Sequence, residues 1–298
     1  MRLIITILCL SFFSECYGQG YLEVGNLSYD VMPLKIKTTA GDEHFNAGNL
    51  KLTDVVPVFL RKDKSQYLLF GLNLESLGFG GVHPEFPVSN IYGVAAVAGY
   101  CRQVNDRLNV SAILLPFLNS DLYRVTGSDV HFCGVVRGVY RVHKDFSVRA
   151  TLGYRKQFYG TQYVVLLGGD WKINNKWRVF GDLPNNATLC YSVRPKINAG
   201  ISFLSGNTSY HISQEALYLQ YNFAQPGVFA EYYLSSMFAV RGTVAYSYLR
   251  NLDLYNMDEK VSGVVDYIVL GSKPAALNPE VSNGFAFKLS LSLRISER

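Results

Sequence analysis

The amino-acid sequence predicts an all-β fold, a transmembrane antiparallel up-and-down β-barrel of about 14 strands, with about 12 as the alternative count. Two observations lead to this fold class: an export signal at the start of the chain, and amphipathic runs of membrane-spanning length after it. The final run, residues 285–295, shows the pattern most clearly. Its odd positions are all apolar, and its even positions are small, polar or cationic. Because side chains alternate between the two faces of a strand, one face is hydrophobic and the other polar.

Residues 1–18 have the features of a cleaved signal peptide. Arg2 supplies a positive charge, residues 3–13 are apolar, and Cys16 and Gly18 are small residues just before the expected cleavage site. The apolar run is shorter than the roughly 20 residues that a membrane helix needs. We therefore expect residues 19–298 to form one exported outer-membrane β-barrel domain.

The composition of the mature chain excludes several classes of protein. No apolar segment after the signal is long enough for a membrane helix, so any crossing must be made by strands. The net charge is +5, but no Lys/Arg-rich run occurs, so nucleic acid is not an expected partner. Cys101, Cys133 and Cys190 remain after cleavage without a CxxC or a Cys/His metal spacing. We interpret them as wall residues and expect neither a metal nor another cofactor.

Short polar turns separate the amphipathic runs at one end of the predicted barrel, and longer connections join them at the other end. Asn, Asp, Ser and Pro in these turns favour tight turn geometry. An even strand number places both chain ends at the same, periplasmic end. The expected strands are residues 21–37, 49–61, 66–78, 90–103, 107–118, 130–143, 146–157, 162–173, 176–183, 187–194, 196–204, 226–235, 238–251 and 283–296.

The phase of the alternation predicts which side chains line the lumen. In 130–143, 146–157 and 238–251 one phase is apolar and the other carries arginines. A charge facing lipid at mid-membrane costs about 2–4 kcal/mol, so the polar phase should face inward. Aromatic residues such as Trp171 and Trp177 should form a girdle near the short-turn end. The lumen-lining candidates are Arg137, Arg141, Arg149, Arg155, Arg178, Arg241, Asp170 and Asp182, with Lys288, Arg294 and Glu75 on the same phase.

The central part of the chain resembles a known family. Residues 166–178 read LLGGDWKINNKWR and residues 183–191 read LPNNATLCY, followed by YHI at 210–212 and LYNMD at 254–258. This order resembles a family of outer-membrane β-barrel proteins of Gram-negative bacteria that is described only as a domain of unknown function. The resemblance covers residues 50–260 and the final strand. It implies an outer-membrane barrel, and it brings no activity or site residue with it.

Two departures from that family stand out. The connection 252–282 is longer than usual, and the chain ends in Glu297-Arg298 instead of an aromatic residue. The second departure bears on recognition by the barrel-assembly machinery, which we expect as a partner during biogenesis, together with outer-membrane lipid.

Two function classes follow from these observations. The first is a passive small-solute channel, weakly favouring anions because arginines outnumber carboxylates on the inward phase. The second is a non-conducting structural or surface-binding barrel that acts through long extracellular loops at 205–225 and 252–282; a closed lumen would favour it. The extracellular or periplasmic partner of such a barrel is not readable from the sequence.

A remote third alternative is an outer-membrane lipid hydrolase. His211-Ile212-Ser213 resembles the His-x-Ser arrangement of lipid A deacylases, but Gln214 stands where those enzymes have Asn. A match this short arises often by chance, so we do not expect an enzyme and assign no catalytic residue.

Overall fold

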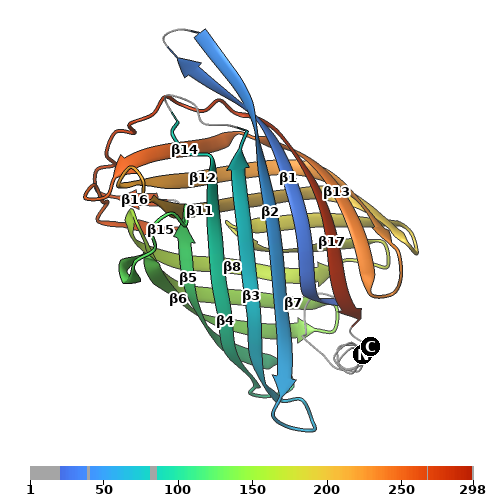
Figure 1. The fold of residues 1–298 in the computed structure, drawn as a ribbon. Coiled ribbons are helices and arrows are strands. Elements are labelled where there is room, and N and C mark those ends of the chain that lie inside the picture. Colours follow the sequence, from blue (N-terminus) through green and yellow to red (C-terminus); the bar gives the residue numbers. More distant parts are fainter. Residues whose placement is uncertain (1–20, 39–40, 81–85, 267, 297–298) are drawn as a thin grey trace, which may run out of the picture.

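The computed structural model describes residues 21–38, 41–80, 86–266 and 268–296, which form a closed antiparallel β-barrel with 14 strand positions (Figure 1). The predicted signal peptide, residues 1–18, lies outside the described residues. The first half of the barrel contains β1 (Tyr21–Thr38), β2 (Gly41–Phe59), β3 (Gln66–Phe79), β4 (Asn90–Gln103), β5 (Leu108–Ser120), a short 3₁₀ turn (Gly127–Asp129), β6 (Val130–His143) and β7 (Phe146–Gln157). The second half contains β8 (Gly160–Lys172), β9 (Trp177–Leu183), β10 (Asn186–Arg194), β11 (Ile197–Ile212), β12 (Leu217–Tyr233), β13 (Phe238–Ser247), β14 (Leu249–Asn256), β15 (Gly263–Val265), β16 (Ile268–Leu270) and β17 (Gly284–Ser296).

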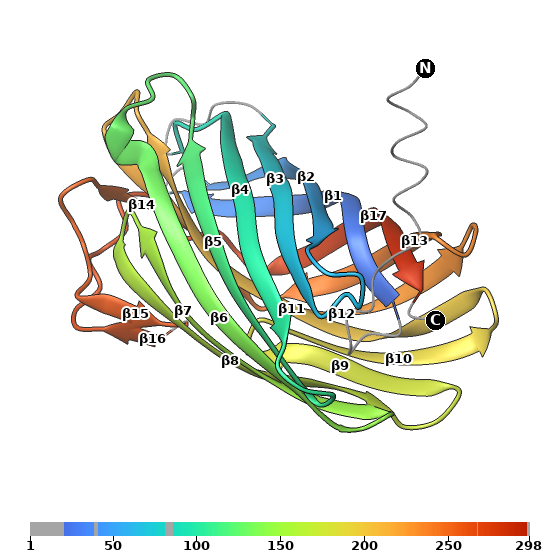
Figure 2. The same ribbon diagram turned by 90° about the horizontal axis from the view of Figure 1, so that it is seen from below.

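The barrel closes where its last strand meets its first. Tyr21 pairs with Ser296 and Val31 with Phe287, so β17 and β1 lie side by side (Figure 2). The two strands β13 and β14 share one position in the wall, because β12 pairs with β13 in one half and with β14 in the other. With that pair counted once, the predicted number of strands and the antiparallel order are confirmed.

The predicted inward and outward faces are also confirmed. On β17, Leu289 is 60% exposed, whereas the alternate residues Ser292 and Arg294 are buried. On β6 and β7 the apolar Val136 and Leu152 point outward, and the intervening phase faces the interior. Of the described residues, none belongs to a helix long and apolar enough to cross a membrane. The outer surface of the barrel is therefore apolar, and its polar side chains lie inside.

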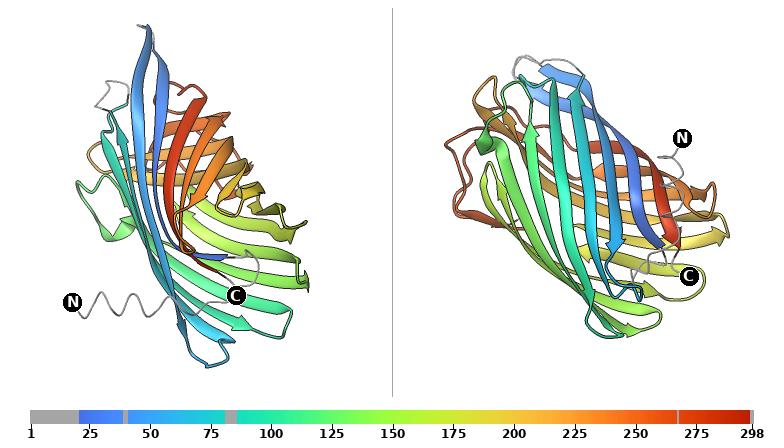
Figure 3. Two further views of the ribbon diagram at one scale, coloured as in Figure 1. Left: turned by 90° about the vertical axis from the view of Figure 1, so that its right-hand side faces the viewer. Right: turned by 60° about the horizontal axis from the view of Figure 1, so that its bottom comes forward.

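Short turns occupy one end of the barrel, as predicted. In the turn between β2 and β3, the N–H and hydroxyl of Ser65 donate to the Asp63 carboxylate at 3.1 and 2.8 Å. These hydrogen bonds hold the pKa of Asp63 below its usual value. We call this the short-turn end and the opposite one the loop end. At the loop end, the β1–β2 hairpin projects beyond its neighbours (Figure 3).

The loop end is closed by the wall of the barrel itself. The outer halves of β11, β12 and β14 cross behind β2–β4 at a steep angle (Figure 1). They reach β5, where His211 forms a parallel pair with Ser120. Segment 277–282 fills the remaining place beside β14 and β1, since Leu277 N–H donates to Leu254 O and Ser282 N–H to Lys35 O. These elements make a smaller ring, which we call the end ring.

Apolar side chains fill the end ring completely. Leu77, Phe86 and Ile91 from the β3–β4 side and Tyr210 and Leu219 from the β11–β12 side are each 0% exposed. Burial of apolar surface on this scale stabilises the closed arrangement, because each large side chain contributes about 1.5–3 kcal/mol. We call this cluster the end core. It separates the interior of the barrel from the loop end.

The predicted long loop 205–225 is wrong. Residues 205–212 continue β11 and residues 217–224 belong to β12, which leaves a turn of four residues between them. The stretch resembles a loop in sequence because both faces of these strand halves are covered by protein, so the apolar-out, polar-in alternation disappears. The predicted loop 252–282 likewise begins with the last residues of β14 and contains the β15–β16 hairpin.

A bend at Tyr248 changes the phase of the β13–β14 position by one residue. Before the bend the even positions face outward, yet Arg250 after it is 1% exposed. Its guanidinium donates to the carbonyl oxygens of Pro33, Gly284 and Phe285 at 2.8–2.9 Å. One buried cation therefore ties β14 to β1 and β17 at the point where β13 and β14 part.

The apolar exterior predicts the effect of a charge on β17. Replacing Leu291, which points outward beside Leu27 and Val240, by Arg should lower the free energy of unfolding by about 2–4 kcal/mol in lipid vesicles. Denaturant titration monitored by tryptophan fluorescence measures this loss. The matched control is Leu60→Arg, in the exposed β2–β3 turn. Equal effects of the two changes would contradict the lipid-facing assignment of Leu291.

Candidate functional site

Two cavities occupy the interior between the end core and the short-turn end. The first, of about 430 Å³, lies between β2–β5 and β6–β8 and reaches β11; we call it the outer cavity. The second, of about 440 Å³, lies beside β1, β2, β12, β13 and β17; we call it the inner cavity. Lys51 and Thr53 line both, so the two cavities adjoin at β2.

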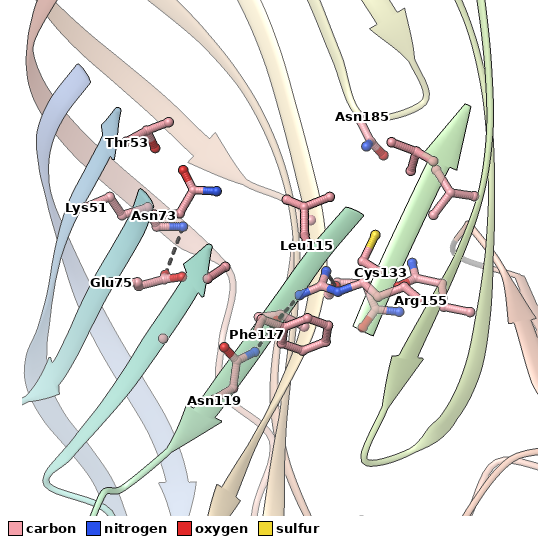
Figure 4. Close-up of a pocket in the computed structure, with 18 of the residues that line it drawn as sticks. Lys51, Thr53, Asn73, Glu75, Leu115, Phe117, Asn119, Cys133, Arg155 and Asn185 are labelled. Carbon is pink, nitrogen blue, oxygen red and sulfur yellow. Dashed lines mark hydrogen bonds and ion pairs between the residues drawn. The ribbon is translucent and has the colours of Figure 1, made fainter. Parts of the chain in front are cut away.

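Charged groups face each other across the outer cavity (Figure 4). On one side, Lys51 Nζ lies 2.9 Å from Glu75, which also accepts from the amide of Asn49 at 2.8 Å. On the other side, the Arg155 guanidinium lies 4.9 Å from the centre of the Phe117 ring. Its hydrogen bonds go to neutral oxygens of Asn207 and Thr208, both at 3.3 Å. Arg155 therefore retains a positive charge that no carboxylate in the described part of the chain neutralises directly.

A carboxylate with two arginines organises the wall of the inner cavity. Glu231 on β12 accepts from Arg294 at 2.7 Å and from Arg241 at 2.9 Å. The Arg241 guanidinium also lies 4.1 Å from the Phe229 ring. Nearby, Lys288 Nζ is 3.7 Å from Asp30. These contacts join β12, β13, β17 and β1 from the inside, next to the seam where the barrel closes.

Most of the arginines among the predicted lumen-lining residues pair with acids. Arg149 and Arg137 approach Asp182 at 3.2 and 3.5 Å. Arg178 and Asp170 form a two-pronged pair at 2.7 and 2.8 Å. The remaining three differ: Arg241 joins Glu231, Arg155 lines the outer cavity, and Arg141 lies opposite Ser147 at the short-turn end.

These pairs connect neighbouring strands within one wall. Asp182 and Asp170 join β6–β9, and Glu231 joins β12 to β13 and β17. Charge pairs that span the barrel would block it, whereas pairs along the wall stiffen it and leave the centre free. Arg155 differs, because its hydrogen bonds reach from β7 to Asn207 and Thr208 on β11, and these strands are not neighbours in the wall. The charge pairs lie along the wall and leave the two cavities open.

Several functional residues were missed in the sequence. Glu231, Asp30 and Lys51 all lie on the inward phase of their strands, so the same alternation could have identified them. Arg250 could not have been found that way, because the bend at Tyr248 reverses the phase locally.

A polar group at the loop end holds the β11–β12 turn against β5 and β6. His211 Nδ1 lies 2.8 Å from the buried Asp129 carboxylate, and Ser213 donates to Asp121 at 2.7 Å. His211 and Ser213 thus have separate carboxylate partners, and the Ser213 hydroxyl is turned to Asp121. This arrangement anchors the end ring and does not form a nucleophile with its base.

Comparison with known proteins identifies only remote structural similarities. No family model and no curated protein matches the chain, so the family resemblance of residues 50–260 is not confirmed. The toluene transporter TodX of Pseudomonas putida matches with a TM-score of 0.48 and 10% identity, over 96% of this chain and 91% of that one. An outer-membrane channel of P. putida F1 matches with a TM-score of 0.40 and 10% identity, over 95% of this chain and 99% of that one. The NanC porin matches with a TM-score of 0.38 and 10% identity, over 90% and 98%. Because the sequence identities are 10% and the TM-scores lie below 0.5, we assign no site residue or functional role of these proteins to this chain.

The Glu231 network predicts a measurable loss of stability. Glu231→Gln removes the carboxylate shared by Arg241 and Arg294; Arg294 keeps Glu23 at 3.2 Å, whereas Arg241 loses its only carboxylate contact among the described residues. This should cost about 3 kcal/mol of unfolding free energy, since an interior charge that loses its partner is destabilising. Denaturant titration in vesicles measures it. Glu280→Gln, at an exposed site in the β16–β17 connection, is the control. Unchanged stability of the Glu231 variant would show that water in the inner cavity already screens these arginines.

Proposed function

We propose that the protein is an outer-membrane barrel for passive transport of small solutes, with a weak preference for anions, and that its loop end is closed in this conformation. The observation that carries the proposal is the pair of adjoining charged cavities inside a barrel with an apolar exterior. They extend from Arg294 near the short-turn end to Asn119 beneath the end ring. Open volume lined by charged groups inside an apolar wall is what a path for charged solutes through a barrel requires.

The anion preference rests on the balance of charge along the cavities. Arg155 lacks an acidic partner among the described residues, and Asp182 is shared by two arginines. Around Glu231 the charges balance, because Arg241 and Arg294 face Glu231 and Glu23. The lining is therefore net positive, and a positive lining attracts anions and repels cations.

A second function is favoured by one specific observation. The end core seals the loop end with side chains that are 0% exposed, so a solute in the cavities has no axial route past it in this conformation. The alternative is a non-conducting barrel whose loop end binds a partner. The two functions differ in whether loosening of the end core produces conductance.

Selectivity can be tested at Lys288, which lines the inner cavity. Lys288→Glu should shift the reversal potential in a salt gradient toward cation preference, because it places a second negative charge beside Asp30. Planar-bilayer recordings of the purified protein measure this shift. Lys37→Glu makes the same change on the exposed part of β1 beyond the end ring and should have a smaller effect. A wild-type channel that prefers cations would contradict the anion proposal.

Closure can be tested at the end core. Combining Phe86→Ala with Leu219→Ala removes two completely buried side chains and should raise the open probability or the conductance, because the seal loses packing from both sides. Leu122→Ala, exposed in the β5–β6 connection, is the control. If neither the wild type nor the loosened variant conducts while both remain folded, the axial route is contradicted and the partner-binding alternative is favoured.

A further inference from the structure

The hydrogen-bonded wall has a gap on one side of the outer cavity. The hairpin of β9 and β10 ends early: its last pairs are Leu183 with Leu167 and Asn186 with Leu204. Strand β8 continues to Gly160 and β11 to Ile212 without β9 or β10 between them. We call the space above the turn 184–185, between these two strand edges, the side gap.

The side gap lies within the apolar band of the barrel. Leu167 is 67% exposed and lies on β8 midway between Trp171 and Tyr163, which face outward toward the two ends. Leu183, paired with it, is 57% exposed. The polar turn Pro184-Asn185 therefore lies close to the mid-height of the band. Irregular backbone at membrane depth is tolerated only where protein covers it or where it lines a hydrated cavity.

Both conditions occur at the side gap. On the β8 side, β15 pairs with Gln162 and Tyr163, and the Asp266 carboxylate accepts from the Val165 N–H at 3.0 Å. On the β11 side, Ser205 donates its N–H to Asn185 O and its hydroxyl to Pro184 O. Between them lies the outer cavity, whose lining includes Asn185, Asn207 and Asp266. The missing piece of wall is thus replaced by polar side chains of the cavity.

The outer cavity is lined by both apolar and charged side chains. Near the side gap, Val164 and Leu166 from β8 face the cavity. Across the cavity, Phe117 presents its ring, and the Arg155 guanidinium rests on that ring and reaches Asn207 on the β11 edge of the gap. A volume of about 430 Å³ is in the range of small-ligand pockets. Inside the polar rim of the gap, the apolar side chains of Val164, Leu166 and Phe117 together with the Arg155 cation match a molecule with a short hydrocarbon chain and an anionic head group.

We propose that the outer cavity binds a single-chain amphiphile with an anionic head group, which enters sideways from the membrane through the side gap and places its head group against Arg155. The inference rests on the proposed transport function, for which it names a route and a solute class. Lateral entry is also compatible with the closed loop end, because a solute that enters from the side does not need the axial route.

The binding half of the proposal is tested with 11-(dansylamino)undecanoate and the full mature protein in lipid nanodiscs. The dansyl fluorescence should rise with saturable binding, and the matching uncharged alcohol should bind about tenfold more weakly, since a charge-assisted contact is lost. Arg155→Gln should weaken binding of the acid by about the same factor and leave that of the alcohol unchanged. Arg61→Gln, in the exposed β2–β3 turn, is the charge-matched control. Equal affinity for acid and alcohol, or no effect of Arg155→Gln, would overturn the proposal.

The route is tested by filling the side gap at the β9–β10 turn, away from Arg155. Asn185→Trp should slow association of the same probe, whereas Asn175→Trp in the β8–β9 turn should not. Heat-modifiable gel mobility verifies that each variant is folded. Unchanged association in the folded gap-filled variant would overturn the side route. Conductance without probe binding would overturn this inference alone. Probe binding by a protein that neither conducts ions nor speeds passage of the probe into proteoliposomes would overturn the transport function while leaving the binding site.

Discussion

Every backbone N–H and C=O group within the apolar band must find a partner in the chain itself, because hydrocarbon offers none. The antiparallel ladder meets this requirement around most of the wall, and the pairing of β17 with β1 removes the last free edge. Where the hydrogen bonding between neighbouring strands ends, side chains and short segments supply the missing hydrogen bonds. Asp266 and β15 complete the edge of β8, Asn278 caps Leu252 and Leu254 on β14, and Ser205 holds the β9–β10 turn. The irregular parts of the molecule follow from the same requirement as the regular ones.

The sequence predicted the wall well and the loop end poorly, for one physical reason. A strand between lipid and water-filled interior must alternate, and all of the predicted strands occur near their expected positions. The outer halves of β11 and β12 have protein on both faces, so Tyr210 and Ser209 are neighbours that are both buried. In these strand halves the alternation of apolar and polar residues is absent, so it cannot indicate that the residues belong to a strand. The bend at Tyr248 hides Arg250 for a related reason, since a single irregular residue reverses the phase that follows it.

The candidate site was predicted in outline. Phase alone placed Arg137, Arg149 and Asp182 on the interior surface, and the register then brought them together. The phase of the alternation could not predict which strands lean inward or where the hydrogen bonding between strands ends. It also could not predict which arginine has no acidic partner among the described residues. Arg155 differs from Arg149 only in height along β7, yet one faces a cavity and the other a carboxylate.

The position of Arg250 has a consequence for biogenesis. Two of its three carbonyl partners belong to β17 and the third belongs to β1, the two strands that form the closing seam. Until β1 and β17 have paired, the Arg250 guanidinium lacks its three carbonyl acceptors, and β14 lacks the hydrogen bonds that hold it in the end ring. The β1–β17 seam and the end ring must therefore form together. A barrel whose β1–β17 seam has not yet formed lacks the contacts that hold β14 in the end ring, so its loop end stays open until the seam forms.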